Sequence, residues 1–163
     1  MSVLNFKKVN DLDINKYLEY RNLKVNLENS ISKRKINKID HYIWWLNNVD
    51  RKSYIVAREN TDLLILYHSV KFLKKKKIIF PGYFVCGNKF SISDLLKSIK
   101  WQNKTLDKIS GKKICAIIVP KNNIFSNAHS KYFGYKMLDE KSKLYNQLKK
   151  LKSFNKNFNI YIR

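Results

Sequence analysis

The stretch 123–135 carries polar residues whose types and order suggest a binding site. It follows an apolar run at residues 114–119, which is typical of a buried strand. Asn123 comes after this run, Ser126 comes three residues later, and a short amphipathic helix is predicted at 126–133. Asn123 has two possible roles, either to cap the helix that follows or to present its amide to a ligand.

Three side chains are candidates for proton transfer. His129 and Ser130 lie in the same predicted helix, and His68 lies in a predicted strand at 63–70. Histidine is the usual choice for this role because its pKa lies close to neutral pH. The alternative for His68 is a hydrogen-bonded histidine inside a sheet. The sequence shows no spacing typical of metal ligands and no Ser-His-Asp or Cys-His motif.

The net charge is +22, from 34 Lys and Arg against 12 Asp and Glu. Such a charge favours an anionic partner, and a basic nucleic-acid-binding domain is one alternative for the chain. Only five of these 34 cations are Arg, and Lys, Asn and Ile, which all have A/T-rich codons, are abundant throughout. We therefore interpret most of the charge as compositional bias. The anion could equally belong to a nucleotide-linked substrate.

The length of 163 residues predicts a single domain spanning 1–163. The apolar content of 44% argues against disorder. No apolar run approaches the roughly 18 residues that span a membrane, and the first residues lack a signal-peptide pattern, so we expect a cytoplasmic protein. Cys86 and Cys115 lie in apolar runs and are expected to be buried thiols rather than a disulfide or metal pair.

Hydrophobic periodicity predicts a mixed α/β (α+β) sandwich with the order β-α-α-β-β-β-α-β-α-β-(α)-β. The predicted strands are 3–6, 53–57, 63–70, 78–86, 113–119, 135–138 and 158–162, and the predicted helices are 11–20, 36–46, 91–109, 126–133 and 141–151. Residues 23–35 are expected to form a loop with a short turn of helix. Pro81 is expected to weaken the first half of its strand or to mark a bulge. Ser91 and Asp94 form a capping-box pattern.

The order strand, Asn123, Ser126, helix and Gly134-Tyr135 resembles the C-terminal half of the GNAT family, the acetyl-coenzyme A-dependent N-acetyltransferases. The element order is similar to that family along the whole chain. The resemblance implies a GNAT-like three-layer sandwich that moves an acetyl group from acetyl-coenzyme A to an amine. It also implies that Asn123 and Ser126 hold the pantetheine arm. Ser130 stands where the family often has a tyrosine acid, so Ser130 or His129 is expected to substitute.

Arg21-Asn22 and His41-x-x-Trp44 resemble one branch of this family, which includes amino-sugar and ribosomal-protein acetyltransferases. The resemblance implies that these four residues wall the acceptor site. Arg21 is then expected to bind an acidic group such as a diphosphate through its planar fork, and a nucleotide-linked amino sugar is the first candidate acceptor. The alternative is that Trp44 is an ordinary core aromatic and His41 a histidine on a helix surface.

The family binds the coenzyme A diphosphate with a glycine-rich loop before the long helix. The corresponding stretch here has serines in place of both glycines, and the resemblance assigns cofactor contacts to Asn88, Lys89, Ser91, Ile92 and Ser93. Helix N-termini bind anions through exposed N–H groups. Backbone N–H groups near Phe84, Val85 and Cys86 are expected to polarise the thioester. The alternatives are a plain capped helix start and a GNAT fold that has lost catalysis and serves in binding only.

Overall fold

The computed structural model describes residues 3–154 and 157–163. Within them, seven strands form one sheet in the order β1-β2-β3-β4-β5-β7-β6. The strands are β1 (Leu4–Lys8), β2 (Arg51–Arg58), β3 (Thr61–Leu73), β4 (Lys76–Val85), β5 (Lys113–Pro120), β6 (Lys136–Met137) and β7 (Phe158–Ile162). The helices are the 3-10 helix η1 (Asp11–Asp13) and α1 (Ile14–Arg21), α2 (Lys24–Glu28), α3 (Lys38–Asn47), α4 (Ile92–Asp107), α5 (Ile124–Tyr132) and α6 (Lys143–Lys152).

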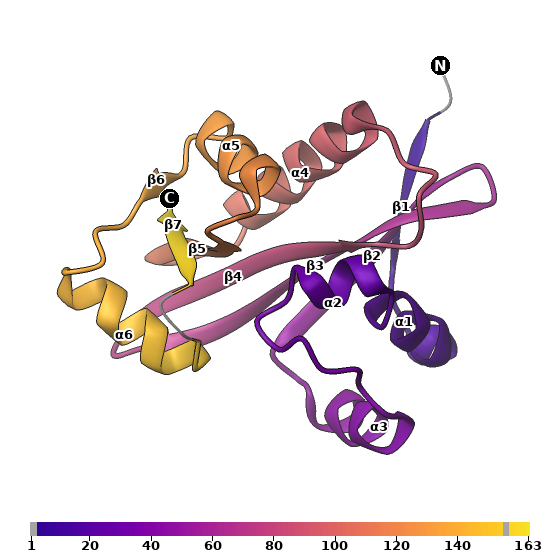
Figure 1. Cartoon of the computed structure of the whole chain (residues 1–163), viewed down its shortest axis with the longest axis horizontal. Coiled ribbons are helices and arrows are strands. Elements are labelled where there is room, and N and C mark those ends of the chain that lie inside the picture. The colour runs from indigo at the N-terminus through magenta and orange to yellow at the C-terminus, as the bar shows by residue number, and fades with distance from the viewer. Residues whose placement is uncertain (1–2, 155–156) are drawn as a thin grey trace.

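Helices cover both faces of the sheet, so the predicted mixed α/β sandwich is confirmed (Figure 1). Helices α4 and α5 lie on one face, and α1, α2, α3 and α6 lie on the other. Strands β4 and β5 pair in parallel, and the other neighbours in the described sheet pair antiparallel.

Strand alternation separates the two cores, because successive side chains point to opposite faces. On the α4 face, Leu64 and Leu66 pack with Leu95 and Ile99. On the other face there are two clusters. In the first, Tyr17 of α1 packs with the strand residues Ile55, Ile65 and Phe84. In the second, farther along the sheet, Tyr145 and Leu148 of α6 pack with the strand residues Ile78, Phe80, Ala116 and Ile160.

Strands β4 and β5 diverge after a short parallel pairing. They pair only from Lys77–Lys113 to Ile79–Cys115, and β5 then pairs with β7 on its other side. Pro81 follows two residues after the last pair, and the β3–β4 register continues through it without a shift. The bulge expected at Pro81 is therefore wrong. Because proline has no N–H to donate, it is compatible with the point where a neighbouring strand is lost.

The diverging strands β4 and β5 form a wedge. At its narrow end, where the two strands still pair, lysine side chains bind backbone carbonyls. Lys113 at the start of β5 donates from Nζ to three carbonyls at the C-terminal end of α4 and just beyond it, those of Leu106 (2.7 Å), Asp107 (2.8 Å) and Ile109 (2.7 Å). A lysine side chain can satisfy the last carbonyls of a helix in this way, and the Leu106 carbonyl also accepts the N–H of Ile109 at 3.1 Å. Nζ of Lys77 donates in the same region to the Ser110 carbonyl at 3.0 Å.

Several element boundaries differ from the predictions. The first predicted helix divides into η1 and α1, with a capping box between Asn10 and Asp13. Helix α5 begins at Ile124, two residues before the predicted start, because Asn123 is its N-cap. The capping box predicted at the start of α4 is confirmed. Cys115 is buried and Cys86 half-buried, and both are free thiols. Among the described helices, none has the length and apolar character required to cross a membrane.

Candidate active site

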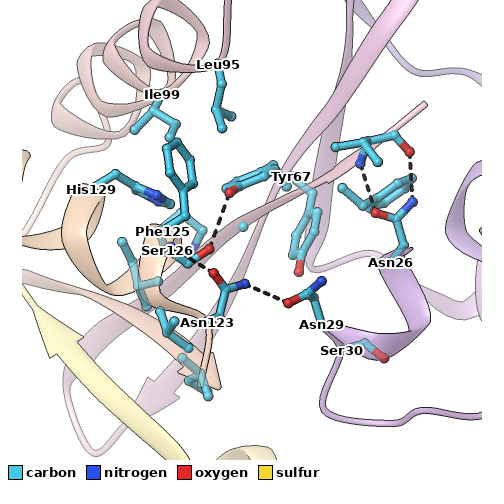
Figure 2. A pocket seen from close by; sticks show the side chains of 18 of the residues that line it. Asn26, Asn29, Ser30, Tyr67, Leu95, Ile99, Asn123, Phe125, Ser126 and His129 are labelled. Carbon is cyan, nitrogen blue, oxygen red and sulfur yellow. Dashed lines mark hydrogen bonds between the residues drawn. The ribbon is translucent and has the colours of Figure 1, made fainter. Parts of the chain in front are cut away.

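A cavity of about 410 Å³ opens where β4 and β5 diverge. Residues 81–85 of β4 and 117–120 of β5 form two of its walls. Helices α4 and α5 add apolar and polar side chains from one face, and α2 closes it from the other (Figure 2). The cavity is lined mainly by apolar residues with a few convergent polar groups, which is the usual composition of a small-molecule site.

The structure brings part of the predicted site together at this cavity. Seven of the predicted residues line it: Arg21, Phe84, Val85, Ile92, Asn123, Ser126 and His129. The other ten do not: Asn22, His41, Trp44, His68, Cys86, Asn88, Lys89, Ser91, Ser93 and Ser130.

Asn123 acts as a helix cap and also lies in the cavity wall. Its Oδ1 accepts the N–H of Ser126 at 2.9 Å, which satisfies one unpaired donor in the first turn of α5. Its Nδ2 donates to Oδ1 of Asn29 at 2.7 Å, and this contact joins α5 to the end of α2 across the cavity (Figure 2). The capping interpretation of Asn123 is thus observed.

Two of the backbone donors expected to polarise a thioester already have partners. The N–H of Val85 donates to Oδ1 of Asn26 at 3.0 Å, and the N–H of Cys86 donates to the Leu63 carbonyl at 2.9 Å. The N–H of Tyr83 points to the same side of β4 as that of Val85, because strand residues two apart share an orientation. Tyr83 is therefore the better placed donor at the divergence of β4 and β5.

His129 is the histidine that lines the cavity. Its side chain is buried, and Nδ1 has no hydrogen-bond partner within the described residues. Burial lowers the pKa of His129, and the Phe125 carbonyl opposes this shift without forming a hydrogen bond of standard geometry to Nδ1. The ring is therefore neutral at pH 7 and has a lone pair to offer, as a general base requires.

Ser130 and His68 lie outside the cavity. Ser130 is fully buried, and its hydroxyl donates to the Ser126 carbonyl one turn earlier at 2.7 Å. His68 is buried in β3 on the face that carries Leu66, which is the α4 side of the sheet. Of the three proton-transfer candidates, His129 is the one that lines the cavity.

Tyr83 also lines the cavity, and it was not among the residues predicted from the sequence. Its hydroxyl lies 3.4 Å from Oγ of Ser126, and its ring lies 5.8 Å from that of His129. Burial raises the pKa of Tyr83, which keeps the hydroxyl protonated at neutral pH. Its position in an apolar strand gave no signal, because only the divergence of β4 and β5 exposes it to a ligand.

The predicted acceptor residues divide into two groups. Arg21 lines the cavity, whereas Asn22 exchanges two hydrogen bonds with the backbone of Ile36 at 2.8 and 2.9 Å. His41 is 1% exposed, so the helix-surface alternative is wrong, and its Nε2 lies 3.0 Å from the Ile14 carbonyl. Trp44 packs against Tyr17 in an aromatic cluster. Asn22, His41 and Trp44 therefore brace the helices near the cavity.

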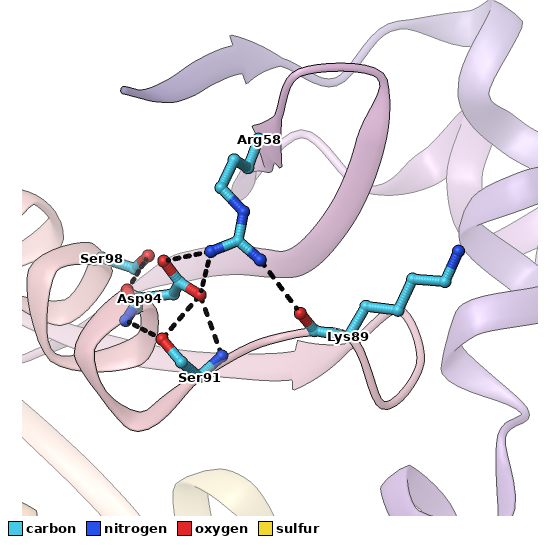
Figure 3. A network of polar contacts seen from close by, with 5 residues as sticks. All are labelled: Arg58, Lys89, Ser91, Asp94 and Ser98. Atoms are coloured by element: carbon cyan, nitrogen blue, oxygen red, sulfur yellow. Dashed lines mark hydrogen bonds and ion pairs between the residues drawn. The ribbon is translucent and has the colours of Figure 1, made fainter. Parts of the chain in front are cut away.

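The N-terminus of α4 is occupied by a carboxylate of the chain itself (Figure 3). Oδ2 of Asp94 accepts the N–H and the hydroxyl of Ser91 at 2.9 and 2.8 Å, and Nη1 of Arg58 lies 3.1 Å from the same oxygen. Burial opposes ionisation, but the Ser91 hydrogen bonds and the Arg58 charge outweigh it and lower the pKa of Asp94. The plain capped start is therefore observed, with an added ion pair.

Part of this helix end remains available to an anion. Among the described residues, the N–H groups of Ile92 and Ser93 donate no hydrogen bond. Lys89 is exposed and joins no described ion pair, and its carbonyl accepts from Nη2 of Arg58 at 3.4 Å. The donor set fits a phosphate, although the Asp94 charge lies immediately behind it.

No protein-family model matches the chain, and no curated protein matches it. Solved structures do match. A domain from Methanocaldococcus jannaschii DSM 2661 has a TM-score of 0.75 at 20% identity, over 100% of this chain and 99% of that one. RimL, a ribosomal alpha-N-protein acetyltransferase in complex with coenzyme A, has a TM-score of 0.70 at 11% identity, over 100% and 94%. FdhC, a nucleotide-linked sugar GNAT, has a TM-score of 0.69 at 13% identity, over 99% and 86%.

Proposed function

Because the chain has the GNAT fold, we propose that it is an N-acyltransferase that moves an acetyl group from acetyl-coenzyme A to a primary amine. The observation that carries the proposal is the cavity between the diverging strands β4 and β5, which holds a buried neutral histidine. The donor supplies an acetyl thioester, and the residues of the chain supply its binding and the movement of protons.

The cavity fits the pantetheine arm of the donor. Its walls between β4 and β5 are largely apolar, and the β5 edge there faces β7 rather than β4. Asn123 and Ser126 line the α5 side, and the N–H groups of Ile92 and Ser93 with Lys89 would receive the diphosphate. The serines at 91 and 93 leave those N–H groups in place, because a serine side chain does not remove the backbone donor.

His129 and Tyr83 are assigned the two proton transfers. The amine must lose a proton as its nitrogen bonds to the acetyl carbon, and neutral His129 accepts it. The C–S bond breaks, and the leaving sulfur takes a proton from the hydroxyl of Tyr83. The N–H of Tyr83 is assigned to the acetyl oxygen, where a backbone donor stabilises developing negative charge.

A nucleotide-linked amino sugar is our first candidate acceptor. Two observations support it, the position of Arg21 in the cavity wall and the likeness of the fold to FdhC. An amino sugar linked to a nucleotide carries both the amine required by the reaction and a diphosphate that an arginine fork can bind.

The proposal is tested by ligand-induced stabilisation and by turnover. Acetyl-coenzyme A at about 100 times its dissociation constant should stabilise the fold by roughly 2.7 kcal/mol. Thiol release is then followed with a panel of amines. Absence of a melting shift at saturating donor concentrations would overturn the proposal.

Two histidine variants separate catalysis from folding. His129→Gln should lower kcat by about 100-fold or more and leave the donor-induced melting shift in place. His68→Gln is the matched control, because His68 is also buried but lies outside the cavity. Equal loss of kcat in both variants would remove His129 from the assigned role.

A binding protein without catalysis is the second candidate function. The observation that favours it is the buried Asp94 carboxylate at the N-terminal end of α4, which places negative charge beside the expected diphosphate position. Donor binding without thiol release for any amine in the panel would support this candidate over the enzyme.

A further inference from the structure

Three cationic side chains without a carboxylate partner lie near Tyr67 and Ser69 of β3. The guanidinium carbon of Arg51 lies 3.6 Å from the centroid of the Tyr67 ring. Arg21 and Tyr67 both line the cavity. Lys152 of α6 donates to Oγ of Ser69 at 3.1 Å. Ser69 lies two residues beyond Tyr67 on β3 and directly opposite Arg51 of β2. The cluster therefore continues from the cavity along one face of the sheet.

These cations have no counter-charge within the described residues. The ion pairs of the described residues include none of Arg21, Arg51 and Lys152. Nε of Arg51 is buried and lacks a hydrogen-bond partner. The carboxylate of Asp50, next to Arg51 in the chain, pairs instead with Lys71 at 3.0 Å.

Like charges held close together oppose folding unless an anion joins them. Aromatic rings supply part of the compensation, since Arg51 stacks on Tyr67 and Nζ of Lys152 lies 4.6 Å from the centroid of the Phe80 ring. The remaining repulsion acts on Lys152, where burial and the charges of Arg51 and Lys71 lower the pKa of the side chain to about 8. Arrangements of this kind concentrate at functional sites.

We propose that Arg51, Lys152 and Ser69 form an anion subsite that binds the phosphate or diphosphate group of the acceptor. The inference rests on the proposed acyltransferase function for the identity of the bound molecule. The amine would then lie in the cavity near His129, and the phosphate end would lie beside Ser69 of β3, with Arg21 between them.

The number of unpaired cations favours phosphate over carboxylate. A carboxylate carries one charge, whereas a phosphate monoester carries about −1.5 to −2 at pH 7 and three acceptor oxygens. Arginine offers a planar fork to such a group, and lysine adds a point charge. Ser69 contributes a hydroxyl that already contacts Lys152.

Inorganic pyrophosphate is the probe for this subsite. It should bind the full chain in the absence of acetyl-coenzyme A, as measured by calorimetry and by a rise in melting temperature. Lys152→Gln should raise its dissociation constant by about tenfold or more, as expected for a lost hydrogen bond to a charged group. Arg51→Gln should do the same, and Lys152 keeps the test valid if the Arg51 variant misfolds.

Lys150→Gln is the matched control, because Lys150 is an exposed lysine of the same helix and the change in net charge is identical. Its effect should stay below about twofold, since exposed charges are screened by salt. If Lys150→Gln and Lys152→Gln weaken pyrophosphate binding equally, the effect is a general attraction between the basic protein and the anion, and the subsite is overturned.

The pH dependence of pyrophosphate binding gives a second test of the subsite. As the pH rises above about 8, the pyrophosphate affinity of the natural chain should fall relative to that of Lys152→Arg, whose charge persists. The other charged groups facing Lys152 are Arg51 of β2 and Lys71 of β3, the latter paired with Asp50. A parallel decline in both proteins would overturn the assignment to Lys152.

Failure of this subsite and failure of the proposed function are distinguishable. If pyrophosphate and acetyl-coenzyme A compete, the cluster belongs to the donor phosphates, and the acceptor subsite is overturned. If pyrophosphate does not bind at low ionic strength, the subsite is also overturned, while a donor-induced melting shift would still support the acyltransferase. If both ligands bind and their melting shifts add, both proposals are supported.

Discussion

Asn26 pairs with the backbone of Val85 as a neighbouring strand would. Its Nδ2 donates to the Val85 carbonyl at 2.8 Å, and its Oδ1 accepts the Val85 N–H at 3.0 Å (Figure 2). This pair lies on β4 beyond the point where its pairing with β5 has ended. One amide side chain from α2 thus satisfies the two main-chain groups that the divergence of the strands leaves without partners.

Replacing Asn26 by alanine should destabilise the fold strongly. Both main-chain groups of Val85 are buried, and an unsatisfied buried group costs about 1–3 kcal/mol. We expect a loss of roughly 2–4 kcal/mol in the free energy of unfolding, measured with urea. Asn29→Ala, at an exposed hydrogen bond near the same helix, is the control and should cost less than about 1 kcal/mol. Equal losses would show that the Val85 contacts are replaced by water.

Replacing Asp94 by asparagine should strengthen the binding of acetyl-coenzyme A. The substitution removes the negative charge behind the N–H groups of Ile92 and Ser93 while keeping an acceptor for Ser91. We expect acetyl-coenzyme A affinity to rise roughly fivefold at low salt, the equivalent of about 1 kcal/mol for one carboxylate charge that lies near a phosphate and is partly offset by Arg58. Calorimetry at two ionic strengths measures it. An unchanged dissociation constant would mean that the diphosphate lies away from the N-terminal end of α4.

Replacing Gly82 by alanine should disturb Tyr67. A Cβ at position 82 would lie 2.5 Å from Cζ and Oη of the Tyr67 ring. That ring cannot shift freely, because Arg51 stacks on it. We expect pyrophosphate binding to weaken by about threefold to tenfold, since the displaced ring carries Arg51 with it. Gly87→Ala is the matched control, as its Cβ would meet no atom within 4 Å. Similar binding by the two variants would contradict the expected coupling.

The stability of the protein should fall as the pH falls below neutral. All three histidines of the chain, His41, His68 and His129, are buried, and burial lowers the pKa of each. The folded state therefore resists protonation, while the unfolded chain takes up protons below a pH of about 6.5. The unfolding free energy should drop by up to about 1.4 kcal/mol per pH unit for each additional proton.

Urea unfolding between pH 8 and pH 5 checks this slope. His68→Gln should flatten it, because one of the three titrating groups is removed. A stability that is constant, or that increases toward pH 5, would contradict the burial of the histidines as neutral rings.

Periodicity and capping signals in the sequence predicted the elements well, because these signals are local. Strand β7 has the predicted bounds 158–162, and Ser91 begins α4 as its capping box indicated. The start of α5 was misplaced, since the capping role of Asn123 extends the helix toward it. Which of His129, Ser130 and His68 lines the cavity depends on the orientation of each side chain, and spacing alone did not provide it.

The contacts that build the site join distant parts of the chain. Asn26 reaches Val85 across 59 residues, and Lys152 reaches Ser69 across 83. The first contact depends on the position of α2 beside β4, and the second on the return of α6 over β3 and β4. A lysine among many lysines gave no signal of this position, so the anion subsite could be recognised only from the folded chain.

The lysines at the narrow end of the wedge make it a hinge with one stiff end. Lys113 binds three carbonyls at the C-terminal end of α4 and just beyond it, where β4 and β5 still pair. The wide end is bridged by the exposed contact between Asn29 and Asn123. Opening should therefore swing α5 away from α2 and leave residues 77–79 and 113–115 in place. In the free protein, amide hydrogens at the start of α5 should exchange faster than those of the paired segments, and a bound ligand should slow them. Uniform exchange along β4, β5 and α5 would mean that the wedge opens as one unit. Faster exchange confined to α5 would instead support ligand entry by bending between β4 and β5, in the interior of the sheet.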